Sequence, residues 1–129
     1  MLNKLNHIAL ILDGNKRWAK KNKLSNFSGY TKGFENIKKL VTYSLSKKIS
    51  NVTIFALSSE NFNRSSISVI YEIIYDNFSK TFEDLVKEKG VKIKIFGSRK
   101  SLPHKILKIY ENVEESSINN KKLNLNIAF

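Results

Sequence analysis

The chain of 129 residues has no cysteine and contains only one proline, one tryptophan, one methionine and five glycines. The lack of cysteine excludes disulfides, thiolate metal sites and a cysteine nucleophile. With no linker rich in proline or glycine, residues 1–129 are expected to form a single domain. The only early apolar stretch, 1–12, is too short and too polar to span a membrane and is followed by no signal cleavage pattern. We therefore expect a cytoplasmic protein.

Acidic residues are also scarce, because 11 Asp and Glu stand against 23 Lys and Arg, giving a formal net charge of +12. A field of this sign attracts phosphates of any kind, so nucleic acid, anionic lipid and diphosphate substrates all remain open as partners. Hydrophobic residues make up 41% and aromatic residues 11% of the chain, which is the composition of a globular protein. This composition argues against wholesale disorder.

Apolar runs typical of buried strands alternate with segments of helical periodicity. The first run, 7–12, is continuous, as in a strand that is buried on both faces. This alternation predicts the α/β class, with a mainly parallel sheet of about four strands and flanking helices. Strands are expected at 7–12, 52–57, 91–96 and 123–129, and helices at 34–48, from Ser65 or Ser66 to Lys89, and from Pro103 onward.

The predicted last strand, 123–129, is apolar and is followed by no capping helix or polar tail. In addition, the first half of the predicted helix 65–89 is apolar over more than one face, whereas a surface helix has a single apolar stripe. We therefore expect either a truncated domain or one partner of a larger assembly, with further protein or an apolar ligand against this helix.

A polar loop follows the first predicted strand and begins Asp13-Gly14-Asn15. In open parallel sheets, ligands bind beyond the carboxyl ends of the strands. Gly14 allows close approach of the backbone, the amides at a helix start point at an anion, and Arg17 offers a planar fork for phosphate oxygens. Asp13 alone cannot hold Mg²⁺, but one or two carboxylates together with substrate phosphates usually do. This loop therefore suits a diphosphate, although the same residues also fit a turn with a solvated lysine face.

A second polar loop, 58–64, follows the second predicted strand with hydroxyls, an amide, a carboxylate and a guanidinium. Trp18 and Phe27 fit packing anchors better than a base-stacking platform. His7 begins a predicted strand and fits a structural position, whereas His104, near a helix start, fits an exposed position better than a catalytic one. The sequence has no pair of histidines at ligand spacing, no nucleophile elbow and no Walker motif, which disfavours hydrolases of those types.

The residues of several blocks resemble the cis-prenyltransferases, the isoprenyl transferases typified by undecaprenyl diphosphate synthase. The blocks are 7–21, with Asp13-Gly14-Asn15-Lys16-Arg17-Trp18, then Gly29 to Gly33, 53–64 and 123–128, in the order of the family. The resemblance spans almost the whole chain but little more than half of the family's usual length. The family's late arginine-rich segment, which binds the diphosphate of isopentenyl diphosphate, has no counterpart here.

The resemblance implies a Mg²⁺-dependent condensation of isopentenyl diphosphate with an allylic diphosphate, giving a cis-polyprenyl diphosphate. It places Mg²⁺ on Asp13, and Asn61 and Ser58 near the reacting carbon and the departing proton. It also implies a homodimer, and membrane association only through the lipid product. By position, the implied substrate-binding residues are Gly14, Asn15, Lys16, Arg17, Trp18, Tyr30, Ala56, Phe62 and Arg64, and the implied tunnel walls are Ala56, Ile70, Ile73 and Ile74.

The chain departs from the family pattern at several positions. Tyr30 replaces a histidine that could contact phosphate or carry a proton, whereas Lys16 replaces a glycine and adds positive charge. The remaining departures are Asn26 for arginine, Phe62 for tryptophan and Ser65 for proline.

Two other classes of function stay open. A non-catalytic subunit or half of a split enzyme, which needs a second chain, would account for the short length. A basic nucleic-acid-binding module would account for the charge of +12. It would not explain the polar strand ends, and no interleaving of aromatic and basic residues typical of a stacking platform is present.

Overall fold

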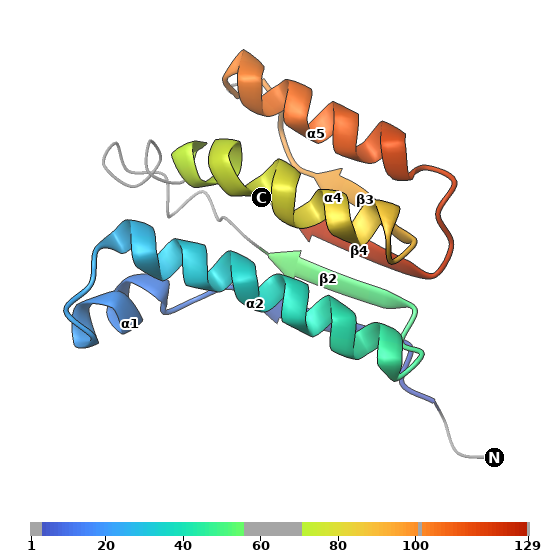
Figure 1. The fold of residues 1–129 in the computed structure, drawn as a ribbon, viewed down its shortest axis with the longest axis horizontal. Helices are drawn as coiled ribbons and strands as arrows, with labels where there is room; N and C mark the ends of the chain where they lie inside the picture. The colour runs from blue at the N-terminus through green and yellow to red at the C-terminus, as the bar shows by residue number, and fades with distance from the viewer. Residues whose placement is uncertain (1–3, 56–70, 101, 129) are drawn as a thin grey trace.

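The computed structural model describes residues 4–55, 71–100 and 102–128, and shows a four-stranded parallel sheet with helices packed on it (Figure 1). The strands follow the order β1-β2-β4-β3, so that β1 and β3 form the two edges. This arrangement confirms the predicted fold class. In chain order the elements are β1 (His7–Ile11), α1 (Asn15–Lys21), α2 (Asn26–Ser46), β2 (Asn51–Phe55), the π-helical segment η2 (Ile74–Phe78), α4 (Ser79–Lys87), β3 (Val91–Phe96), α5 (His104–Ser117) and β4 (Leu123–Ala128).

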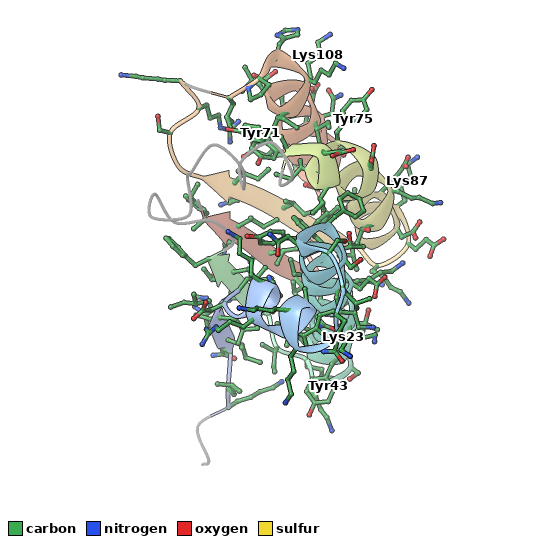
Figure 2. The ribbon with its side chains drawn as sticks, turned by 90° about the vertical axis from the view of Figure 1, so that its left-hand side faces the viewer. Lys23, Tyr43, Tyr71, Tyr75, Lys87 and Lys108 are labelled. Carbon is green, nitrogen blue, oxygen red and sulfur yellow. The ribbon has the colours of Figure 1, made fainter. Side chains whose placement is uncertain are left out.

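The hydrophobic core lies between one face of the sheet and the helices α2, α4 and α5, which Figure 2 shows together on one side of the strands. Alternate residues of each strand point to this face, as the period of a strand requires. Their partners on the helices come from one stripe of each helix. The buried core residues include Val52, Ile54, Ile93, Ile95, Leu125 and Ile127 from the strands, and Ile37, Val41, Phe82, Leu85, Ile106 and Tyr110 from the helices.

The opposite face of the sheet carries mainly polar side chains, together with the exposed Ile11, Phe55 and Phe96, and no described helix packs on it. Thr53 lies at its centre, with its Oγ1 2.7 Å from His7 Nε2 and accepting from Asn126 Nδ2 at 3.2 Å. Nearby, Asn124 Nδ2 donates to Asn51 Oδ1 at 3.1 Å. These hydrogen bonds join β1, β2 and β4 across the face, and they give His7 the structural position expected for it.

The prediction that the first strand is buried on both faces is wrong for the described structure. β1 lies at the edge of the sheet, and Leu10 and Ile11 are 41% and 75% exposed. An edge strand has only one neighbouring strand, so the apolar pattern alone cannot bury it. β2 is buried on one face only, because Val52 and Ile54 face the core while Phe55 points to the open face.

Helix α2 begins at Asn26, well before the predicted start at residue 34. The Oγ of Ser25 accepts the backbone N–H of Ser28 at 3.2 Å and caps the helix. Gly29 and Gly33 in the first turns add no apolar side chains, so the apolar pattern does not indicate this start. The predicted long helix to Lys89 falls partly outside the described residues. Its described part contains the π-helical segment η2 and ends at Lys87, before Gly90 with φ of 69°.

Candidate active site at the carboxyl edge of the sheet

The carboxyl ends of β1 and β2 lie side by side. Ile11 pairs with Phe55 in the parallel register, and the backbone N–H of Leu12 continues the ladder by donating to Phe55 O at 3.0 Å. Asp13 follows directly after this last hydrogen bond. The carboxyl ends of β1 and β2 therefore lie at the same edge of the sheet, and the predicted second polar loop, 58–64, lies outside the described residues.

Asp13 and Arg17 form an exposed pair at the start of α1. Gly14 adopts a left-handed conformation with φ of 85°, which turns the chain sharply from β1 into the helix. Its backbone N–H donates to Asp13 Oδ1 at 2.8 Å, and Arg17 Nη2 lies 3.2 Å from Asp13 Oδ2. The two side chains are 77% and 78% exposed, so the pair stabilises the fold by at most about 1 kcal/mol. A ligand can therefore separate Asp13 from Arg17 at little cost.

Asp13 fits a magnesium ion that is shared with a ligand. Among the described residues, no group of three His, Asp or Glu side chains could hold a metal by itself. Mg²⁺ keeps several waters and is usually held by one or two carboxylates together with substrate phosphates. An accessible carboxylate with a guanidinium beside it matches this pattern, because the guanidinium can bind the same phosphate group from another side.

Asn15 is held against α2 by two glycines that sequence reasoning assigned no role. A Cβ built on Gly29 would lie 2.4 Å from Asn15 O, and a Cβ built on Gly33 would lie 2.9 Å from Asn15 Nδ2. Only glycine allows α1 to approach α2 this closely. The spacing of four residues, which places both glycines on one side of a helix, is the signal that could have revealed this contact.

The remaining described candidates surround this loop on α1 and α2. Lys16 is exposed, and Trp18 is 41% exposed rather than a buried anchor. Phe27 is similarly half-exposed, and Tyr30 of α2 is partly buried against the core. Lys20 and Lys21 add positive charge to the last turn of α1. The loop is therefore strongly basic, which favours an anionic ligand.

Several predicted site residues lie outside the described part of the chain, namely Ala56, Ser58, Asn61, Phe62, Arg64 and Ile70. Their roles stay predictions. Of the predicted tunnel residues, Ile73 and Ile74 are described and are almost fully buried. No helix in the part of the chain that the structure describes is long and apolar enough to cross a membrane.

The fold and the loop together define an α/β protein with an accessible, basic loop at the carboxyl edge of a parallel sheet. Comparison with known proteins specifies the family. The prenyltransferase family model for undecaprenyl diphosphate synthases matches residues 11–129. The chain therefore belongs to this family.

Curated relatives and a solved structure agree with this assignment. The chain is 38% identical over 126 residues to a tritrans,polycis-undecaprenyl-diphosphate synthase (geranylgeranyl-diphosphate specific) of Pyrobaculum aerophilum. It is 34% identical over 125 residues to an isoprenyl transferase of Fusobacterium nucleatum. These matches cover 95% of the chain, but 53% and 54% of the relatives. The crystal structure of lavandulyl diphosphate synthase from Lavandula x intermedia, in complex with dimethylallyl diphosphate, aligns with a TM-score of 0.89 and 27% identity. That alignment covers 95% of this chain and 53% of the other, so the chain spans about half the length of the proteins it matches.

Proposed function

We propose that this chain supplies the allylic-diphosphate site of a cis-prenyltransferase, which condenses isopentenyl diphosphate with an allylic diphosphate to give a cis-polyprenyl diphosphate. The observation that carries the proposal is the accessible Asp13–Arg17 pair at the carboxyl edge of the sheet. It is supported by relatives and a structural neighbour that are named as synthases of prenyl diphosphates.

In the proposed reaction, the bond between the allylic carbon and the diphosphate oxygen breaks, and the electron pair leaves with the diphosphate. The double bond of isopentenyl diphosphate then attacks the allylic carbon, and a proton is lost to form the new double bond. Mg²⁺, when bound, neutralises the charge that develops on the departing diphosphate. Asp13 would hold this ion.

The chain's own residues would bind and orient the diphosphate. Arg17 and Lys16 would stabilise the growing negative charge, because preorganised cations act most strongly where charge develops. Gly14 would let the backbone approach, and Asn15, fixed by its contact with α2, would orient the phosphate oxygens. By resemblance, Arg64 would bind diphosphate oxygens, while Ser58 and Asn61 would face the reacting carbon and the departing proton.

The hydrocarbon tail would lie near the sheet end, along Ala56, Phe62 and Ile70, with Trp18 and Tyr30 completing the substrate surface. A homodimer, or a second polypeptide that supplies the rest of the domain, would complete the site for isopentenyl diphosphate. Because the ligands are diphosphates, nucleic acid is not the proposed partner. Contact with a membrane would come only through the polyprenyl product, and the proposed compartment is the cytoplasm.

Binding tests the proposal without requiring turnover. Titration of the purified chain with farnesyl diphosphate is expected to show binding that depends on Mg²⁺. The variant Asp13→Asn should lose the dependence on Mg²⁺, and Arg17→Ala should weaken binding about 10-fold or more, the loss of a charge-assisted contact. Lys39→Ala, an exposed lysine of α2, is the control and should bind normally. Unchanged Mg²⁺-dependent binding by Asp13→Asn would refute the metal assignment.

Turnover is tested separately with labelled isopentenyl diphosphate, farnesyl diphosphate and Mg²⁺. The chain is assayed alone and together with the part of the Fusobacterium relative that lies outside the match. Chain elongation in either mixture that Asp13→Asn abolishes would support catalysis. Absence of elongation in both mixtures, with intact binding, would favour a non-catalytic subunit.

A further inference from the structure

Asp13 and Gly14 are the only two neighbours in the chain at which an aspartate or asparagine directly precedes a glycine. An aspartate side chain can react with the backbone nitrogen of the next residue to form a five-membered cyclic imide. Glycine favours this reaction, because it has no Cβ to hinder the approach of its nitrogen and restricts the backbone least. Whether the reaction occurs in a folded chain depends on the local geometry, which the structure describes for this pair.

The structure holds the two reacting groups close together. The Gly14 nitrogen lies 2.8 Å from Asp13 Oδ1, and a carbon–oxygen bond is about 1.2 Å long, so the nitrogen is at most about 4 Å from Asp13 Cγ. Arg17 Nη2, 3.2 Å from Oδ2, favours this orientation of the carboxylate. Reacting atoms need to be about 3–3.5 Å apart, so a small rotation of the Asp13 side chain is sufficient.

The Gly14 nitrogen is also outside the regular hydrogen-bond pattern of the neighbouring elements. The ladder between β1 and β2 ends with the N–H of Leu12, and the first bond of α1 runs from Trp18 N to Gly14 O. The N–H of Gly14 instead donates to the Asp13 carboxylate itself. The Asp13 side chain is 77% exposed, so water has free access to both groups.

The other two aspartates of the chain lie in a different backbone environment. Asp76 is within the π-helical segment η2, and Asp84 is within α4, where its carboxylate accepts from Lys38 Nζ at 3.0 Å. A helix directs each backbone N–H along its axis toward a preceding carbonyl, and therefore away from the neighbouring side chain. Asp76 and Asp84 thus serve as internal controls for Asp13.

We propose that Asp13 is a site of spontaneous modification, at which aspartate is converted to isoaspartate through the cyclic imide. The Gly14 nitrogen forms a bond to Asp13 Cγ and gives up its proton. One carboxyl oxygen leaves as water, with that proton and a second one from solvent. Water then opens the imide at either carbonyl carbon. Opening at Cγ restores aspartate, whereas opening at the main-chain carbon gives isoaspartate, in which the backbone runs through Cβ and Cγ.

Isoaspartate would alter the candidate site in two ways. It adds one carbon to the backbone between β1 and α1, and it attaches the free carboxylate directly to Cα. Because α1 is packed closely on α2 through Asn15 and Gly29, the extra length displaces the turn at Asp13 and Gly14. The consequence for activity rests on the proposed function, in which Asp13 holds Mg²⁺. The modified chain would lose Mg²⁺-dependent diphosphate binding, and bound ligand would protect Asp13.

Storage of the purified full chain at physiological temperature, without Mg²⁺ or diphosphate, tests the proposal. Isoaspartate is detected by enzymatic methylation of its free carboxylate and is located by mass spectrometry of peptides. The imide is recognised by a mass lower by one water. Isoaspartate is expected to accumulate at position 13, whereas Asp76 and Asp84 should stay unmodified.

Two variants test the role of the turn. In Gly14→Ala the new Cβ would meet only Arg17 Nη2, at 3.7 Å, although a φ of 85° is strained for alanine. This variant is expected to form isoaspartate about 10-fold more slowly, which corresponds to about 1.4 kcal/mol in the barrier. Asp13→Asn retains Gly14, so it remains informative if Gly14→Ala does not fold. It should form the same imide with loss of ammonia, whereas the matched control Asp84→Asn should keep its amide.

The inference would be overturned if the folded chain formed no isoaspartate at position 13 while the urea-unfolded chain did so, since the native turn would then be protective. Equal rates for the wild type and a folded Gly14→Ala, or an unchanged amide in Asp13→Asn, would also contradict it.

The protection by ligand has a separate readout. Farnesyl diphosphate with Mg²⁺ is expected to slow the modification of Asp13. Equal modification with and without these ligands would refute the metal assignment and leave the modification site standing. Mg²⁺-dependent binding by a chain that never forms isoaspartate would do the reverse.

Discussion

Alanine at the two glycines of α2, Gly29 and Gly33, should have different consequences for the free energy of unfolding. Both positions are helical, where replacement of glycine by alanine contributes about 1 kcal/mol to stability when nothing else changes. At Gly33, the new Cβ would meet only the end of the Asn15 side chain, with Nδ2 at 2.9 Å and Oδ1 at 3.0 Å. This amide can rotate or shift by a few tenths of an ångström.

At Gly29 the obstacle is backbone. A Cβ there would lie 2.4 Å from Asn15 O and 3.0 Å from Ala19 Cβ, and Ala19 is fully buried. Relief requires α1 to move by about 1 Å away from α2, and overpacking of this kind typically costs about 1–3 kcal/mol. The helix gain of about 1 kcal/mol offsets only part of this cost.

Urea unfolding followed by circular dichroism measures both effects. Gly33→Ala is expected to change the free energy of unfolding by between zero and about +1 kcal/mol, while it weakens Mg²⁺-dependent diphosphate binding by displacing the amide of Asn15. Gly29→Ala is expected to lose stability, by up to about 2 kcal/mol net. Lys39→Ala controls for changes elsewhere on α2. If Gly29→Ala proved as stable as Gly33→Ala, or if Gly33→Ala bound diphosphate normally, the proposed positioning of Asn15 would be refuted.

Three further predictions concern other parts of the chain. Burial raises the pKa of Tyr110 above its ordinary value of about 10, so the hydroxyl loses its proton at a lower pH in the unfolded chain than in the folded chain. The free energy of unfolding should therefore fall as the pH rises above about 10, by up to about 1.4 kcal/mol per pH unit. Tyr110→Phe should remove this dependence in unfolding measured from about pH 9.5 to about pH 11.5. Ser117→Ala should cost about 1–3 kcal/mol, because it leaves the buried N–H of Ile93 without its partner; a smaller loss, below about 0.5 kcal/mol, would contradict the role of this hydrogen bond at the β3 edge. Ile11→Lys should leave the temperature of thermal unfolding within about 2 °C of the wild-type value, since the side chain is 75% exposed.

Much of the fold could be predicted from periodicity. The alternation of residues such as Val91, Ile93 and Ile95 with lysines gave β3 its correct bounds, and Pro103 marked the start of α5. The start of α2 could not be found in this way. Gly29 and Gly33 interrupt the apolar pattern. The reason for glycine at these positions is the contact with Asn15 of α1, which forms only when α1 packs against α2.

The burial of β1 could not be predicted either, although its strand character could. An apolar run shows what a strand is suited to, whereas its neighbours in the sheet determine how much of it is covered. Asp13, Gly14 and Arg17 were predicted as a ligand loop, and the structure places them at the carboxyl edge as expected. Their chemical roles depend on bound ligands and stay predictions.

The difference between the β1 and β3 edges of the sheet limits how many molecules can join by strand pairing. A repeating fibre of strands needs a donor edge and an acceptor edge on every molecule, so that each addition exposes a fresh site for the next. Here the side chains of Ser117, Glu114, Asn120 and Arg99 form hydrogen bonds with the outward backbone groups of β3 and so seal one border. Growth at the other border therefore ends after a single addition, and misassembly of this chain should give discrete pairs in place of long polymers.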